Sequence, residues 1–226
     1  MKPVSPFNVL PPLVVALTLV ILGIEAVFQL ANYGIIGGPR GVGWRIAAIE
    51  QYGFSPVVLD RVLVSGDYSF EMLRRFVTYT FINVQLTQVA FCSALILALG
   101  KFTSEYYGSV NVIILYFVTS IAGAVVFGLL VESRYPLVGS FTPTYGLIGA
   151  YTYALWLRLG AAGDKQILAF RLIGFLLLVQ LIFGLVFGGN SQWISELAGF
   201  FAGFLLSIVL APGGWSSLLT RLRQRT

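Results

Sequence analysis

The sequence predicts an all-α membrane protein, built as a bundle of six transmembrane helices with a long membrane-associated first loop. Of its 226 residues, 58% are hydrophobic and only 10% are charged, whereas a soluble domain carries about 25% charged residues. A helix needs about 20 apolar residues to cross a bilayer, so the long apolar runs are the candidate spans. They lie at approximately 12–32, 76–100, 109–131, 139–158, 172–189 and 194–211.

The first run follows a short N-terminal tail, residues 1–11, and begins after Pro11-Pro12. A cleavable signal would instead place a basic segment before a short apolar core, so we expect this run to be retained as a span. Glu25, Gln29 and Asn32 recur at i, i+4 and i+7. This spacing places them on one helix face, which we expect to point into the polar interior of the bundle.

The first loop, residues 33–75, is rich in glycine and proline around two amphipathic pieces, "WRIAAIEQY" and "VVLDRVLV". Neither piece is long enough to cross the bilayer, so we expect the loop to lie on or dip into the interface. Trp44, Tyr52 and Phe54 are typical of interfacial anchors. The loop could form a partner surface or simply shield the helices from lipid.

Basic residues predict the orientation of the chain in its membrane. An even number of spans puts both termini on one side, together with the basic tail at 212–226 and the loop that holds Arg158, Lys165 and Arg171. The positive-inside rule makes that side cytoplasmic, and we expect the inner membrane of a bacterium. Five arginines in the first loop make the bias modest. The other connections are short, so residues 1–226 form a single domain.

The residue inventory limits the chemistry. With one cysteine, Cys92, and no histidine, the chain has no intrachain disulfide and no imidazole base or ligand. We therefore expect no metal and no cofactor. The net charge of +5 comes mostly from segments between apolar runs, so membrane topology explains it better than binding to nucleic acid does.

Glycines punctuate the fourth and sixth runs. Gly146 and Gly149 lie in the fourth, and Gly199 and Gly203 follow the small-xxx-small spacing in the sixth. This spacing favours close backbone approach of two membrane helices, which we expect between these two runs. The alternative is that glycine is simply common in membrane helices.

Four blocks of the chain, in order, resemble the rhomboid family of intramembrane serine proteases from about residue 71 to 211. "RRFVTYTFINVQLTQVAFCSALILALG" is similar to the second helix of the family, and "GKFTSEYYGSVNVIILYFVTSIAGAV" to the segment that follows. "GSFTPTYGLIGAY" resembles the fourth helix and "SELAGFFAGFLL" the sixth. The resemblance implies a rhomboid fold with a lateral opening and a polar interior.

The resemblance also implies that the chemistry is lost. The family's nucleophilic serine, in Gly-x-Ser-Gly, falls on Phe141, and the glycine after it falls on Thr142. The histidine that takes the serine's proton falls on Glu196. Since phenylalanine has no nucleophilic atom and a serine needs a positioned base, we expect a catalytically inactive member, a pseudoprotease.

The family's other polar positions are changed as well. Gln88 and Cys92 stand where a histidine and an asparagine help to bind the oxyanion, and Asn83 stands where an earlier histidine lies. The Trp-Arg pair before the second helix becomes Arg74-Arg75. These replacements alter the donors that would stabilise a tetrahedral intermediate.

Ser140 offers one alternative, because a shift by one residue could pair it with Glu196. One residue along a helix turns the side chain by about 100°, and a carboxylate is a weak base for a serine hydroxyl. We expect Ser140 and Thr142 to cap the fourth helix instead. Cys92 is expected to be a small core residue.

Glu196 needs a partner, since an acidic side chain within a span is costly. One hypothesis is a polar lock with Gln88, Gln85 or a hydroxyl of Ser140 or Thr142; a position at the aqueous rim and contact with a partner are the others. Gln85, Gln88 and Cys92 recur at i, i+3 and i+7, so they could form a facing stripe.

The resemblance implies a non-catalytic membrane protein that binds transmembrane helices of other membrane proteins, as a fixed subunit of a complex or as an escort. The sequence leaves the partner and the oligomeric state open. An active protease using Ser140 and a small transporter or proton path using Glu25 and Glu196 are the alternatives. The sequence shows no internal repeat of the kind that many transporters have, which argues against the transporter alternative.

Overall fold

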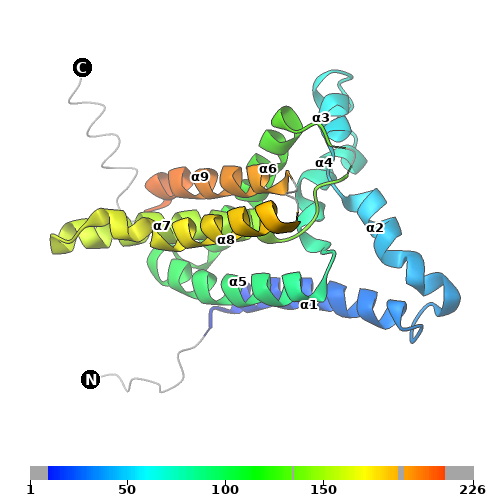
Figure 1. Cartoon of the computed structure of the whole chain (residues 1–226), viewed down its shortest axis with the longest axis horizontal. Coiled ribbons are helices and arrows are strands. Elements are labelled where there is room, and N and C mark those ends of the chain that lie inside the picture. Colours follow the sequence, from blue (N-terminus) through cyan, green and yellow to red (C-terminus); the bar gives the residue numbers. More distant parts are fainter. Residues whose placement is uncertain (1–9, 134, 188–190, 212–226) are drawn as a thin grey trace.

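The computed structural model describes residues 10–133, 135–187 and 191–211, and these residues are almost entirely helical (Figure 1). The only extended pairing among them is one antiparallel bridge between Phe54 and Leu137. The elements, in chain order, are α1 (Pro12–Asn32), η1 (Gly38–Gly43), α2 (Trp44–Tyr52), α3 (Pro56–Leu63), α4 (Phe70–Thr78), η2 (Tyr79–Phe81), α5 (Leu86–Tyr107), α6 (Ser109–Leu130), α7 (Phe141–Ala162), η3 (Gln166–Phe170), α8 (Arg171–Phe187) and α9 (Gln192–Leu210).

Four of the helices, α1, α5, α6 and α9, are long and apolar enough to cross a membrane. A shorter apolar helical stretch covers Gln166–Gln180, and α7 spans 22 residues but interrupts its apolar run with threonines, tyrosines and glycines. The chain is therefore a multi-pass integral membrane protein with four candidate spans. Each of the six expected runs contains a long helix. Among the described residues, four of these helices qualify as membrane spans by length and composition.

The second span begins later than the sequence predicts. Residues 76–100 were expected as one helix, but α4 ends at Thr78 and α5 begins only at Leu86. Ile82 and Gln85 have extended backbones, and Asn83 between them is buried. The physical reason is tertiary, because the side chain of Asn83 and the carbonyl of Thr80 are hydrogen-bonded to Ser140 at the start of α7.

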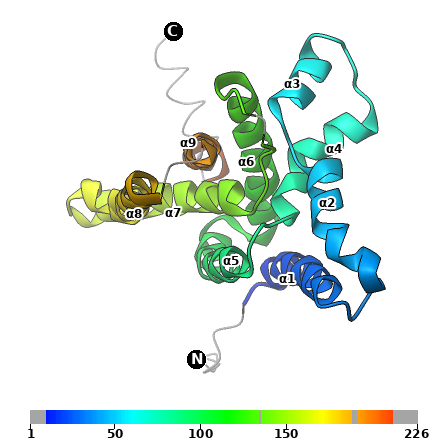
Figure 2. The same cartoon turned by 45° about the vertical axis from the view of Figure 1, so that its right-hand side comes forward.

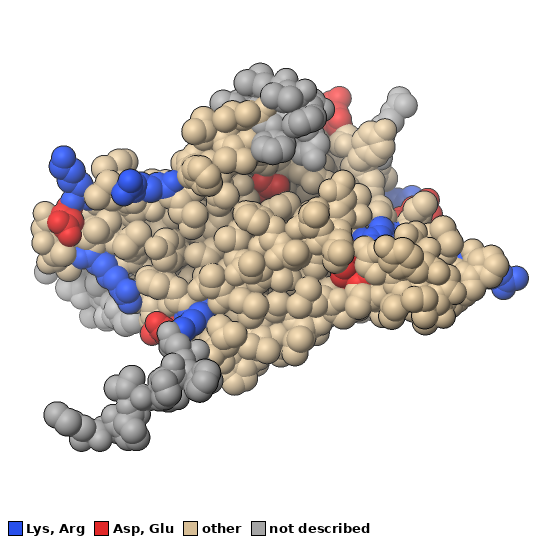
Figure 3. Space-filling model, turned by 60° about the horizontal axis from the view of Figure 1, so that its bottom comes forward, with Lys and Arg blue, Asp and Glu red and all other residues tan. Residues whose placement is uncertain are grey.

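The helices surround a core in which α7 packs most closely on α9 and then on α6 and α5 (Figure 2). Helix α1 packs on the outer side of α5. The start of α1 and the ends of α7 and α9 lie at the same end of the bundle, on the left in Figure 1, whereas the first loop lies at the other end. Most of the face shown in Figure 3 is formed by uncharged residues.

The first loop is a packed part of the fold. Phe54 exchanges two backbone hydrogen bonds with Leu137, at 3.1 and 2.6 Å, and its side chain is fully buried against Phe76 with ring centroids 4.8 Å apart. The expectation that Phe54 is an interfacial anchor is therefore wrong, because Gly53 ends α2 in an extended conformation that turns Phe54 inward. Trp44 does remain 40% exposed.

The C-terminal end of α2 is held by side chains from α4. Arg75 donates to the carbonyl of Glu50 at 3.0 Å, and Thr78 donates to the carbonyl of Tyr52 at 2.9 Å. The guanidinium of Arg74 lies over the Tyr52 ring, 4.7 Å from its centroid. Since the last carbonyls of a helix lack intrahelical partners, these contacts satisfy them and fix α2 on α4.

Glycines let the backbones of α7 and α9 meet. A methyl group on Gly203 would overlap the backbone of Gly146, and one on Gly199 would overlap the carbonyl of Thr142. On the facing helix, Gly149 approaches the carbonyl of Phe200 in the same way. Any larger residue at these positions would have to push the two helices apart.

We predict that Gly203→Ala destabilises the protein by about 1–3 kcal/mol, because the added methyl overpacks a backbone contact that cannot adjust locally. Gly23→Ala is the matched control, since Gly23 also lies within a helix but has open space where its side chain would be. Thermal unfolding in detergent measures both variants. An equal midpoint for Gly203→Ala and the wild type would refute the close α7–α9 contact.

Candidate functional site

Ser140 lies directly before α7 and is fully buried beneath the segment that precedes α5. Its hydroxyl donates to the carbonyl oxygen of Thr80 at 2.6 Å. The side-chain amide of Asn83 contacts Ser140 twice, with Nδ2 donating to Oγ at 3.4 Å and Oδ1 accepting from the backbone N–H at 3.1 Å. The hydroxyl proton of Ser140 is therefore directed at a backbone carbonyl, which is not a base.

The expectation that Ser140 and Thr142 cap α7 is wrong. Ser140 does occupy the N-cap position, but its side chain makes no capping hydrogen bond. It turns toward Thr80 because the buried carbonyl there needs a donor. Thr144 reaches back to the Ser140 carbonyl at 2.7 Å instead.

Phe141 is the first residue of α7, and its side chain is partly buried. The ring packs against the main core and lies 6.2 Å from the ring of Phe91 on α5, centroid to centroid. It therefore occupies space between α5 and α7. A serine at this position would leave that space open.

Thr142 points toward α9, where its hydroxyl lies 2.9 Å from that of Ser195. Ser195 donates its own proton to the carbonyl of Gln192 at 2.7 Å, so Thr142 is the donor in the pair. The methyl group of Thr142 fits over Gly123 of α6, where no side chain could be added without overlap. This threonine joins α6, α7 and α9 in a close three-helix contact.

Glu196 lies on α9 and is only 6% exposed. Its carboxylate accepts a hydrogen bond of 2.6 Å from Nε2 of Gln180 on α8. Gln85, Gln88, Ser140 and Thr142 were the expected partners, but the structure pairs Glu196 with Gln180. Gln180 was missed although it is the only uncharged polar residue of α8, which is the signal that could have identified it.

The three residues of the expected stripe on α5 lie in different surroundings in the structure. Gln85 is exposed at the N-cap of α5, whereas Cys92 is fully buried beside Thr144. The amide of Gln88 lies over Gly139, whose φ of 111° and lack of a side chain both allow this contact. The two carried-over positions on α5 therefore have different neighbours, Thr144 for Cys92 and Gly139 for Gln88.

Glu25 carries the strongest electrostatic contact of the described residues. It is 3% exposed and forms a two-point ion pair with Arg45 of α2, with N–O distances of 2.8 and 2.9 Å. Gln29 donates to the same carboxylate at 2.7 Å, and the Arg45 guanidinium lies over Phe28, 5.1 Å from its ring centroid. Asn32 is exposed, so the inward polar face predicted for α1 includes Glu25 and Gln29 but not Asn32.

Arg45 also connects Glu25 to the segment around Ser140. One of its terminal nitrogens donates to the backbone carbonyl of Asn83, whose side chain holds Ser140. A continuous polar chain thus runs from α1 through α2 to the start of α7. Among the described residues, no three acidic or cysteine side chains gather as a metal site requires.

We predict that Glu25→Leu and Arg45→Met each destabilise the protein by about 3 kcal/mol, because each leaves a buried charge without its partner. The double variant should recover most of this loss, since it removes both charges. Glu71→Gln is the control: Glu71 is exposed and lies 3.5 Å from Arg75, which keeps its hydrogen bond to the Glu50 carbonyl, so the loss should be small. Additive single effects in equilibrium unfolding would contradict the pairing.

Comparison with known proteins places the chain in a family. The family profile described as Rhomboid domain matches residues 71–213, more than half of the chain. A search of curated proteins gives no match. The matched region begins in α4 and includes α5 to α9, and therefore also Ser140, Phe141 and Glu196. The chain belongs to the rhomboid family.

Proposed function

We propose that this protein is a non-catalytic rhomboid, a pseudoprotease that binds transmembrane helices of other membrane proteins. In this proposal the six long helices α1, α5, α6, α7, α8 and α9 all cross the membrane, with both termini on the cytoplasmic side. The first loop lies at the opposite face and is partly embedded there. Its proposed partners are other membrane proteins and the surrounding lipid bilayer.

One observation carries the proposal: the nucleophile position holds Phe141, and its ring packs against Phe91. Acyl transfer from a peptide bond needs a nucleophile, a base within hydrogen-bond reach and donors for the oxyanion. Phe141 supplies no such atom, and its ring fills space between α5 and α7. This supports a site that is closed to chemistry.

The alternative Ser140–Glu196 pair has little support. A nucleophile and its base must lie about 2.6–3.2 Å apart, but Ser140 is bonded to Thr80 and Asn83 while Glu196 is bonded to Gln180. Pairing here would require both side chains to give up buried hydrogen bonds. A proton path is disfavoured too, since Glu25 is held in an ion pair by Arg45.

Helix binding is supported by the packing of α8. Within the described residues, α8 contacts mainly η3 and has few contacts with α7 and no extended contact with α5. Its buried polar link to the bundle is the hydrogen bond from Gln180 to Glu196. Ile173 is buried in the core and Leu172 packs against it, so the start of α8 stays attached to the bundle. In this proposal a partner helix binds beside α5, where the described part of α8 makes no extended contact.

Site-specific photocrosslinking tests this proposal. A benzophenone amino acid at Phe91, which is 48% exposed on α5, should crosslink to membrane proteins through their transmembrane segments. The same group at Tyr135, 84% exposed in the loop before α7, is the matched control and should not. Mass spectrometry of the crosslinked species then identifies the partners.

One partner in equal amount would make the protein a fixed subunit of a complex, whereas several partners in small amounts would make it an escort. Equal crosslinking from both positions, or crosslinks to lipid alone, would contradict helix binding at α5.

A further inference from the structure

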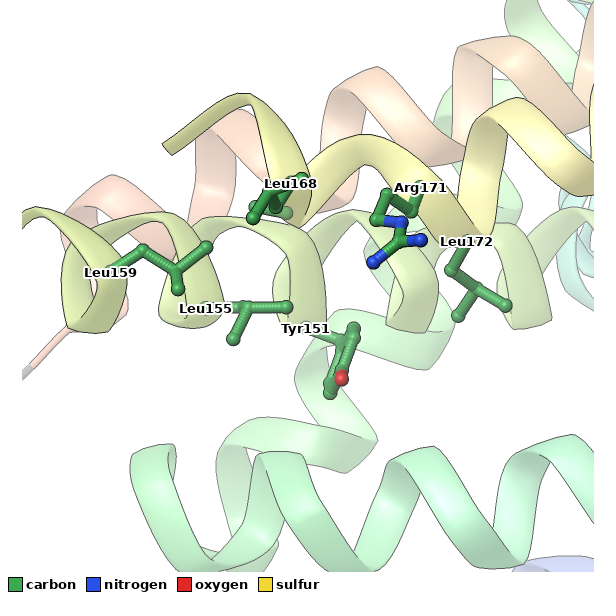
Figure 4. Close-up of a pocket in the computed structure, with 7 residues that line it drawn as sticks. Tyr151, Leu155, Leu159, Leu168, Arg171 and Leu172 are labelled. Carbon is green, nitrogen blue, oxygen red and sulfur yellow. The ribbon is translucent and has the colours of Figure 1, made fainter. Parts of the chain in front are cut away.

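We infer that a cavity between α7 and the start of α8 binds an anionic phospholipid, a ligand that the proposed function does not require. The cavity has a volume of about 400 Å³, within the size range of small-molecule sites. Figure 4 shows it between the C-terminal half of α7 and the chain that returns through η3 into α8. Its lining residues are Tyr151, Leu155, Leu159, Leu168, Ala169, Arg171 and Leu172.

Arg171 gives the cavity its charge. Its guanidinium lies beside the cavity, near Tyr151 and Leu172 (Figure 4). The ion pairs found in the described part of the chain are Arg45–Glu25 and Arg75–Glu71, so no carboxylate of that part neutralises Arg171. A guanidinium offers five donors in a fixed fork that fits two phosphate oxygens at once.

Apart from Arg171 and Tyr151, the side chains that line the cavity are apolar. Four leucines, two from α7 and two from the returning chain, form its walls. Such walls suit an acyl chain, while a free inorganic anion would gain nothing from them. The combination of one unneutralised guanidinium with leucine-lined walls fits a molecule that has a phosphate at one end and hydrocarbon at the other.

The place of the cavity in the bundle favours an anionic headgroup. It adjoins the end of α7 and the loop with Lys165, the end of the bundle that also holds the start of α1 (Figure 1). The proposed orientation makes this the cytoplasmic leaflet, whose anionic lipids attract basic pockets between helices. Arg158, also in this region, lies over Phe102 with 4.7 Å to the ring centroid, so Arg171 is the better placed of the two for the phosphate.

Native mass spectrometry of the purified full chain, with dioleoylphosphatidylglycerol or dioleoylphosphatidylcholine added in detergent, tests the inference. We expect the wild type to retain phosphatidylglycerol in preference to phosphatidylcholine. Arg171→Gln should weaken that retention by about fivefold, the effect of one basic residue near anionic lipid. Arg40→Gln is the matched control, because Arg40 is an exposed arginine in the first loop and should leave retention unchanged.

A second variant tests the apolar part. Leu168→Trp fills the cavity without changing charge and should displace the lipid while Arg171 remains. Equal retention of the two lipids, or equal loss in Arg171→Gln and Arg40→Gln, would overturn the inference. So would displacement of the lipid by inorganic phosphate at equal concentration, because the site would then recognise the anion alone. Unfolding midpoints of the variants in detergent separate loss of lipid from loss of fold.

Discussion

The buried amide of Asn83 is the contact on which the arrangement of the site depends. It holds Ser140 through both its oxygen and its nitrogen, and its own backbone carbonyl is bound by Arg45. Since buried polar groups must be paired, this one residue fixes three things together: the late start of α5, the seat of α2 against α1, and the first residue of α7. The position of Phe141 follows from it.

The same contact explains what the sequence could and could not predict. Glycine spacing in α7 and α9 predicted close helices, and Glu25 was predicted to face inward, because both depend on local periodicity. The break between Thr78 and Leu86 was missed because residues 76–85 are largely apolar, and only a partner distant in sequence, Ser140, makes them leave the helix. The Glu196–Gln180 pair was missed for a related reason: Gln180 is the one uncharged polar residue of α8, but nothing local shows that α8 faces Glu196.

The structure makes Phe141 and Thr142 part of the packing. The ring of Phe141 packs against that of Phe91. Thr142 packs over Gly123 and is hydrogen-bonded to Ser195. Replacement of a nucleophile by a large ring would otherwise cost stability through overpacking. In our account the interior that a protease would keep open for water and peptide is filled, and a partner helix binds beside α5 without being cut.

The most direct test of this account is cleavage of transmembrane substrates in proteoliposomes, read as new peptide termini by mass spectrometry. The account predicts the same termini for the wild type and Ser140→Ala, with no labelling of either by a fluorophosphonate serine probe. An active rhomboid protease in the same liposomes is the positive control. A cut that the wild type makes and Ser140→Ala does not would contradict the account, because Ser140 would then be a nucleophile.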